Sequence, residues 1–287
     1  MASYSIKDLE KLTGIKAHTL RIWEQRYELL TPQRSDTNIR FYSDEEAIKL
    51  LKVTALYNQG YKISRIASMN EASINECIVD SELNASHGQA YIEKLTIAMI
   101  ELSEALFITT FDQAIAEHGF KDTVIKIIYP FLEKLGVMWT VGGINPAQEH
   151  FISNLIRQKL IARIDKIYDP VAKPSKRAIL FIPEGDLHEL GLLFYSYLLQ
   201  ESGYQVIYLG QSVPAEDVLS VAKTYQCNLF VCSVINPSIV EEFKGTIKTL
   251  FKQFPKANLY IAGSQKDQFL KLHKSIHQIA SAEDLPR

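Results

Sequence analysis

The segment from Glu184 to Gly191, which reads EGDLHELG, holds residue types and spacings that could bind a metal. His188 can present a neutral imidazole nitrogen to a metal ion. Asp186, two residues earlier, can accept a hydrogen bond from the other ring nitrogen and so fix the tautomer and orientation of the ring. Gly191 removes a side chain where a ligand must approach the chain closely. The pattern predicts one metal-binding imidazole held by a carboxylate.

One imidazole is too few for a bare zinc or iron ion, which needs about three or four ligands. One imidazole is enough where a macrocycle supplies the other ligands of the metal. Two later loops favour a macrocycle with a nucleotide-like tail, because Ser233 in CSVI and Gly263 in IAGS place a small hydroxyl and a glycine after two apolar runs. The alternative is that His188 is an ordinary surface or capping residue, which is the commoner role of a lone histidine in such a loop.

The elements that must position these residues are strands and helices that alternate along residues 176–287. This alternation predicts a doubly wound, flavodoxin-like parallel sheet with helices on both faces. Ligands of such sheets bind beyond the carboxyl ends of the strands, at the switch point, where the Glu184–Gly191 segment would lie. The apolar runs lie at 178–182, 205–209, 228–234 and 258–262, and the expected helices lie at 189–202, 215–225 and 238–254.

The order D-x-H-x-x-G, then S-x-L, then G-G resembles the cobalamin-binding fold of methionine synthase and its relatives. The resemblance implies that His188 is the lower axial ligand of the cobalt and that Asp186 is its partner. It also implies that Gly191 belongs to the cofactor site and that Ser233 and Gly263 line the channel of the nucleotide tail.

Two positions depart from that pattern. Ile235 replaces the leucine, a conservative change, and Ala262 replaces the first glycine of the pair, so that its methyl group could crowd the tail. A domain that binds no cofactor and acts through protein partners is therefore the alternative interpretation.

The first part of the chain, residues 1–75, reads as a small DNA-binding domain. A helix over 6–13 with a Ser5–Asp8 capping box is followed by Gly14 and a second helix over 16–27, which is the helix-turn-helix pattern. Residues 30–41 then read as a loop or hairpin, and Ser43 with Glu46 restarts a helix. Candidate DNA contacts are Lys16, His18, Thr19, Arg21, Arg26, Tyr27, Arg34, Asn38, Arg40 and Tyr42.

The run IKAHTLRIWEQRY over residues 15–27, followed by RSDTNIRFYS over 34–43, resembles the start and the wing of the MerR family. The resemblance covers about residues 3–70 and implies a dimeric winged helix-turn-helix regulator. The long coiled coil through which typical members dimerise is not evident after residue 61, so the rest of the chain must supply the association.

Residues 76–170 show helical periodicity without strand-like alternation, which predicts a bundle of about four helices. Trp139 is expected in a loop, and Asn145, Pro146 and Gln148 are expected to start the helix that carries Glu149 and His150. This W-x9-E-H spacing resembles the CarH and LitR photoreceptors, MerR-type regulators that use adenosylcobalamin. The resemblance implies that Trp139, Glu149 and His150 line the pocket of the upper cobalt ligand. A core role for Trp139 is the alternative.

Composition narrows the class of protein. Residues 1–70 hold 11 Lys and Arg against 8 Asp and Glu, a net charge of +3, whereas the rest of the chain carries −5, as expected for a DNA-binding head. Three cysteines without a CxxC motif argue against a disulfide framework or a zinc site. No secretion signal or membrane span is expected, so we expect a cytoplasmic protein. The Asp169–Ser175 segment, with two prolines, reads as a linker.

These observations predict a multidomain α and α/β protein with domains at 1–75, 76–170 and 176–287. The expected function is a cobalamin-sensing transcription regulator, a repressor, which binds double-stranded promoter DNA as a dimer or tetramer. It senses either cobalamin itself or light, through photolysis of adenosylcobalamin, and the sequence leaves both open. We expect no enzymatic activity. A cobalamin carrier of the methyltransferase type and a redox sensor based on Cys227 and Cys232 are less favoured alternatives.

Overall fold

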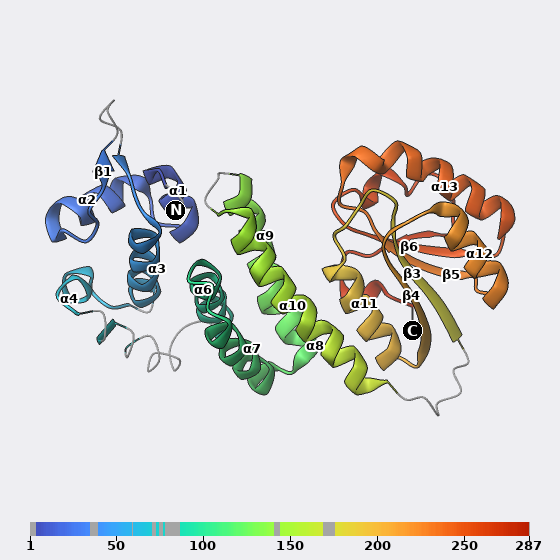
Figure 1. Ribbon diagram of the computed structural model, residues 1–287, viewed down its shortest axis with the longest axis horizontal. Helices are drawn as coiled ribbons and strands as arrows, with labels where there is room; N and C mark the ends of the chain where they lie inside the picture. The colour runs from blue at the N-terminus through green and yellow to red at the C-terminus, as the bar shows by residue number, and fades with distance from the viewer. Residues whose placement is uncertain are drawn as a thin grey trace. The chain divides into compact units, whose positions relative to one another are not determined.

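The computed structural model describes residues 4–34, 40–58, 60–70, 73–74, 77, 87–140, 144–168 and 176–286. The chain divides into two compact units, Met1–Leu155 and Ile156–Arg287 (Figure 1). The expected head and bundle share the first unit, and helix α10 (Pro146–Ile167) runs across the boundary between the units. The expected Asp169–Ser175 linker lies outside the described residues.

The head begins with two short helices separated by Gly14. The capping box before the first helix is confirmed, because the Asp8 N–H donates to Ser5 Oγ over 3.3 Å and the Ser5 N–H donates to Asp8 Oδ2 over 2.7 Å. Gly14 ends the helix with a φ of 75°, a left-handed conformation that a glycine adopts without strain. The elements are α1 (Ile6–Thr13), α2 (Ala17–Tyr27), β1 (Gln33–Arg34), β2 (Arg40–Phe41), α3 (Asp44–Asn58) and α4 (Ile63–Ala67).

A small antiparallel hairpin, β1 with β2, follows α2 and confirms the expected wing. Ser43 Oγ accepts the N–H of Glu46 over 3.3 Å at the start of α3, as expected for an N-cap. The Glu46 carboxylate accepts the N–H of Thr31 over 2.9 Å, which joins the segment before the hairpin to α3.

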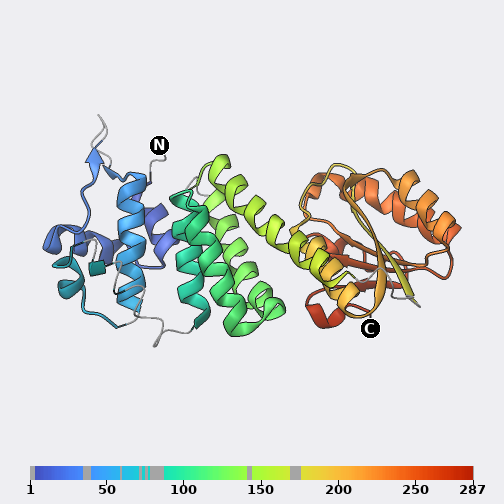
Figure 2. The ribbon, with the colours of Figure 1, turned by 60° about the horizontal axis from the view of Figure 1, so that its bottom comes forward.

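Helices follow one another in the described part of the predicted bundle, as Figure 2 shows in green. The segment from Phe120 to Thr140 is continuous, with a π-helical stretch between two α-helices. Asn145 and Gln148 cap α10 reciprocally, over 3.1 and 2.9 Å, as predicted. The elements are α6 (His87–Ile100), α7 (Glu104–His118), α8 (Phe120–Thr123), η2 (Val124–Ile128), α9 (Tyr129–Thr140) and α10.

The second unit holds a parallel sheet in the order β4-β3-β5-β6-β7. The chain leaves β3 toward β4 and then crosses to the other side of β3 to form β5, so the switch point lies between β3 and β5. The strands are β3 (Lys176–Pro183), β4 (Tyr204–Val213), β5 (Leu229–Ser233), β6 (Asn258–Ala262) and β7 (Ile276–Gln278). The first four confirm the predicted runs, and β7 was not predicted.

Helices cover both faces of this sheet. The apolar residues of α12 and α13 pack with those of β3, β5 and β6 in one core, whereas α11 contacts the sheet on the opposite face (Figure 2). A fully buried Leu, Ile, Val or Phe side chain contributes roughly 1.5–3 kcal/mol, so these faces hold the unit together. The helices are α11 (Leu190–Glu201), α12 (Ala215–Tyr225) and α13 (Val240–Gln253), with short turns η3 (Pro237–Ile239), η4 (Lys266–Gln268) and η5 (Ala282–Asp284).

Candidate functional site

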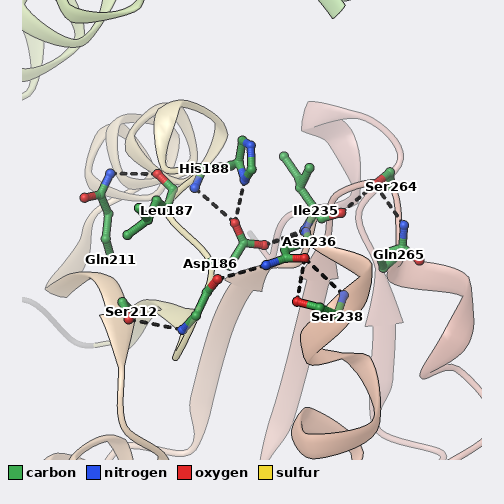
Figure 3. Close-up of polar contacts among 11 residues, drawn as sticks. Asp186, Leu187, His188, Gln211, Ser212, Ile235, Asn236, Ser238, Ser264 and Gln265 are labelled. Atoms are coloured by element: carbon green, nitrogen blue, oxygen red, sulfur yellow. Dashed lines mark hydrogen bonds and ion pairs between the residues drawn. The ribbon is translucent and has the colours of Figure 1, made fainter. Parts of the chain in front are cut away.

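The predicted imidazole–carboxylate pair lies in the loop between β3 and α11. His188 Nδ1 is 2.6 Å from Asp186 Oδ1, and the His188 N–H donates to the same oxygen over 3.1 Å. The His188 side chain is 60% exposed, whereas that of Asp186 is 1% exposed. Figure 3 shows the imidazole on the side of Asp186 that faces away from the strands. The predicted contact between the ring and the carboxylate is therefore present in the structure, with the ring exposed and the carboxylate buried.

Asp186 remains ionised in this position. Burial alone would raise its pKa, but the His188 ring and the backbone N–H groups of Asn236, Ile235 and His188 together hold the pKa well below its ordinary value. Because an ionised carboxylate only accepts hydrogen bonds, His188 Nδ1 must be the donor. In the neutral imidazole the lone pair is then on Nε2, the nitrogen that a metal would meet.

The same carboxylate joins the loops on both sides of the switch point. Asp186 Oδ2 accepts the N–H groups of Ile235 and Asn236, over 2.8 and 2.9 Å, from the loop after β5. Asn236 Nδ2 in turn donates to the Gly185 carbonyl over 3.0 Å (Figure 3). On the β4 side, Ser212 Oγ accepts the Gly185 N–H over 3.1 Å. The Asp186 carboxylate therefore joins its own loop to the loop after β5 and also positions the imidazole.

The two glycines of the predicted site differ in what surrounds them. A Cβ added at Gly263, where φ is 92°, would lie 2.3 Å from the Val234 carbonyl oxygen, so the fold itself requires glycine there. A Cβ added at Gly191 would meet only the Tyr195 ring, at 4.0 Å. Nothing within the described residues therefore requires Gly191 to lack a side chain, and the space beside it is available to a ligand.

The residues of the predicted tail channel lie at the ends of neighbouring strands. Ser233 ends β5 and pairs in register with Ala262, which ends β6. Both residues are buried, and Ile235 is exposed within the loop that Asp186 holds. The buried methyl group of Ala262 is thus next to Ser233 in the sheet, at the departure from the G-G pattern.

Sequence reasoning missed a second buried carboxylate beside the histidine. Glu189, 5% exposed, accepts Arg157 Nε over 2.6 Å and the hydroxyl of Tyr208 over 2.8 Å. The pKa values of both donors are raised, that of Arg157 chiefly by the bond to Glu189 and that of Tyr208 chiefly by burial. Because Arg157 belongs to α10, these bonds attach that helix to the loop that carries His188. The signal for Glu189 was its adjacency to His188 in HELG.

The predicted bundle residues divide into two groups. Glu149 and His150 lie in the first turn of α10, as predicted, and His150 Nδ1 is 2.8 Å from Glu149 Oε2. The His150 side chain is 71% exposed. Trp139 was expected in a loop, and the structure corrects this by placing it in the last turn of α9. The helix that begins at Tyr129 continues through Trp139 and ends at Thr140.

In the head, the predicted DNA-contacting residues of α2 are largely exposed. His18 and Arg21 are three residues apart and share one face of the helix, and Arg26 is exposed near its end. The Arg26 guanidinium lies 5.6 Å from the centre of the Tyr27 ring. Lys16, whose side chain is 82% exposed, lies 3.2 Å from Glu10 Oε1 immediately before the helix. Thr19 is partly exposed.

Glu24 joins this helix to the hairpin and was not predicted. Its two carboxylate oxygens accept Arg40 Nε over 3.1 Å and the Tyr42 hydroxyl over 2.7 Å. Tyr42 is 0% exposed, which corrects the prediction that it contacts DNA. Burial and the bond to Glu24 raise its pKa. Arg34 is exposed in β1, and the predicted contact Asn38 lies outside the described residues.

Two features are absent from the described residues. They contain no group of three or more His, Cys, Asp and Glu side chains that could hold a metal ion by themselves. A metal bound at His188 would therefore need further ligands from a group such as a macrocycle, which fits the one-imidazole site. No helix in the described ranges is both long and apolar enough to cross a membrane.

Two separate parts of the chain match models of known protein families. Residues 4–72 match the family model described as MerR HTH family regulatory protein, and residues 91–163 match the one described as B12 binding domain. The second match falls on the helices α6 to α10.

The chain is similar over nearly its whole length to two proteins of Myxococcus xanthus. The HTH-type transcriptional repressor CarH is 24% identical, over 99% of this chain and 97% of its own length. The HTH-type transcriptional repressor CarA is 27% identical, over 93% of this chain and 88% of its own length.

A solved structure supports the fold. The monomethylamine corrinoid protein of Methanosarcina barkeri matches 69% of this chain and 95% of its own, with a TM-score of 0.59 and 18% identity. The chain therefore combines a MerR-type helix-turn-helix head with a B12-binding region and is a homologue of the CarH and CarA repressors.

Proposed function

We propose that this chain is a transcriptional repressor that binds promoter DNA and is controlled by a bound cobalamin, with adenosylcobalamin as the form that makes it sensitive to light. The observation that carries the proposal is the exposed His188 imidazole on the buried, ionised Asp186, at the switch point of a parallel sheet. The similarity to CarH and CarA, along nearly the whole chain, supports the regulatory role.

His188 is the proposed lower ligand of the cobalt. Asp186 keeps the proton on Nδ1, so that the lone pair of the neutral ring is on Nε2. The open space beside Gly191 accommodates the macrocycle, and Ser233 and Gly263 line the tail. A corrin would supply the further cobalt ligands that the described residues do not provide.

The response to light is proposed to depend on Trp139, Glu149 and His150. A bound adenosylcobalamin supplies a cobalt–carbon bond that light breaks. Glu149 and His150 lie in the first turn of α10, and Arg157 of the same helix bonds to Glu189 beside His188. A change at the first turn of α10 can therefore reach the histidine loop through one helix. A ligand shifts the equilibrium between two conformations of the protein only by its different affinity for each of them.

The proposed DNA-binding residues are the exposed Lys16, His18, Arg21, Arg26 and Arg34, with Thr19, Tyr27, Asn38 and Arg40. Tyr42 is a positioning residue under Arg40, since both bond to Glu24. We propose that the chain acts as a dimer or tetramer, because several heads on tandem sites bind more tightly than one.

Reconstitution with adenosylcobalamin in the dark tests the cofactor site. Wild-type protein should hold the cofactor through gel filtration and absorb visible light, whereas His188→Ala should lose it. Gly191→Leu should also lose it, because the side chain fills the open space. Gly245→Leu is the matched control, because Gly245 is also a helical glycine with nothing within 4 Å of an added Cβ. Retention by Gly191→Leu would contradict the site.

Gel shifts with the upstream promoter region, before and after illumination, test the regulatory half. The loaded protein should bind DNA in the dark and release it in the light, with a parallel change in size-exclusion volume. DNA binding that changes with neither cofactor nor light would favour the alternative in which the domain binds no cofactor and acts through protein partners. Cofactor binding without any DNA binding would favour the other alternative, a cobalamin carrier of the methyltransferase type.

A further inference from the structure

A separate cavity lies within the first unit, between helices of the head and helices of the bundle. Its volume is about 250 Å³, and its walls include Lys11 of α1, Thr54 of α3, Gln89 and Glu93 of α6, and Lys134 of α9. A water molecule takes about 30 Å³ of liquid, and drug-sized ligands take pockets of roughly 300 Å³ or more. The cavity thus suits a compound of metabolite size.

Thr54 is the first sign that something outside the chain belongs there. The residue is 2% exposed, and its buried Oγ1 has no hydrogen-bond partner among the described residues. A buried hydroxyl left unpaired costs about 1–3 kcal/mol, so such groups are rare without a reason. A ligand oxygen in the cavity would supply the missing partner.

The second sign is a pair of opposite charges in the lining, the buried Glu93 of α6 and the partly buried Lys134 of α9. Glu93 is 6% exposed, and its Oε1 accepts Asn58 Nδ2 over 3.1 Å and Gln89 Nε2 over 3.2 Å. Burial raises the pKa of Glu93 and lowers that of Lys134, although each charge favours the other. The structure gives no hydrogen bond to Lys134 among the described residues, so its ammonium can donate to a ligand in the cavity.

The charges define the class of ligand. Two lysines, Lys11 and Lys134, and one carboxylate, Glu93, line the cavity, so a single negative charge balances the charges of the lining. We propose that the cavity binds a small hydroxycarboxylate anion, with its carboxylate on Lys134 and its hydroxyl on Thr54 Oγ1. The walls come from the DNA-binding head and from the bundle, so the ligand stabilises one placement of the head. This input to the regulator is separate from the cofactor site at His188.

Ligand-observed NMR on the full chain, with L-lactate as the probe, tests the proposal. Lactate should bind saturably. Propionate, which lacks the hydroxyl, should bind at least about threefold more weakly, and lactamide, which lacks the charge, at least about tenfold more weakly. These three ligands test the site on unmodified protein, so the result does not depend on whether a variant folds.

Two variants locate the bound lactate. Thr54→Val and Lys134→Met should weaken lactate binding by about fivefold and about tenfold. Thr109→Val and Lys126→Met, at exposed positions of the same unit, are matched controls and should bind as wild type. Cofactor absorbance should be unchanged in all four variants, which separates this site from the one at His188. The proposal fails if lactate shows no saturable binding, or if both cavity variants bind it as wild type does.

Discussion

Two carboxylates, the buried Asp186 in the second unit and the partly buried Glu24 in the head, each hold a nitrogen-bearing side chain at a proposed binding surface. Asp186 accepts the His188 ring and also three backbone N–H groups from two loops. Glu24 accepts two side chains, Arg40 and Tyr42, from one hairpin. The first carboxylate therefore fixes backbone as well as a ligand, and the second fixes side chains.

The difference matches what each surface must recognise. A metal ligand must be held within about 0.5 Å of its working position, which requires a fixed backbone and packed neighbours. A phosphate contact fixes register without reading sequence, and a long arginine side chain can follow a DNA backbone that bends. Backbone donors at Asp186 and side-chain donors at Glu24 are thus two degrees of preorganisation in one chain.

The largest effect should come from Asp186→Ala. The N–H groups of Ile235 and Asn236 lose a buried acceptor, and the free energy of unfolding should fall by about 3 kcal/mol. Cofactor affinity should fall by about 10–100-fold, because the ring loses its orienting partner. Denaturant unfolding and visible absorbance measure the two losses. Asp267→Ala, at an exposed carboxylate of the same unit, should stay within about 0.5 kcal/mol of wild type.

Acid should reproduce part of this loss. The folded-state pKa of Asp186 lies below its ordinary value of 3.8, so the unfolded chain binds the proton more readily. Its stabilisation is therefore complete above about pH 5 and is lost as the pH falls below 3.8 toward the folded pKa. Unfolding curves at a series of pH values should show the gap between wild type and Asp186→Ala narrowing on acidification. A gap that stays constant would mean that the carboxylate charge is not what holds the loops.

The sequence predicted Asp186 and missed Glu24 for a physical reason. Asp186 and His188 are two residues apart, so local spacing alone brings them together. The partners of Glu24 lie 16 and 18 residues along the chain, and those of Glu189 include one 32 residues away. Only the fold brings such residues into contact.

The predictions of strands and of buried residues show the same limit of local sequence patterns. The four long strands were predicted because each is a continuous apolar run, whereas β7 (Ile276–Gln278) has three residues, two of them polar. Tyr42 looked like a DNA contact because it follows Arg40 in the wing, but its backbone pairs with Tyr4 and its hydroxyl bonds to Glu24, which buries the side chain in the core. Gly191 and Gly263 looked alike in the sequence, and only their surroundings separate a ligand space from a backbone contact.

A smaller effect is expected at Glu24. In Glu24→Ala the buried Tyr42 hydroxyl loses its acceptor, so the free energy of unfolding should fall by about 1–2 kcal/mol. A double-mutant cycle with Arg40→Ala should give a coupling of only about 0.5–1 kcal/mol, because that pair is partly exposed. Unfolding of the four proteins measures it. A coupling as large as the Asp186→Ala loss would remove the contrast between the two carboxylates.

The smallest effect should be that of Arg40→Ala on DNA binding. If Arg40 contacts a phosphate, its loss should weaken binding by less than about tenfold, equally for promoter and unrelated DNA, and should reduce the salt-dependence slope by about 0.9. Glu24→Ala should weaken binding through the same side chain, so the double variant should bind no more weakly than the weaker single one. Fluorescence anisotropy at several salt concentrations measures both. A loss confined to the promoter sequence would instead make Arg40 a reader of bases, and the hairpin would then need the fixed geometry that we assign to the histidine loop alone.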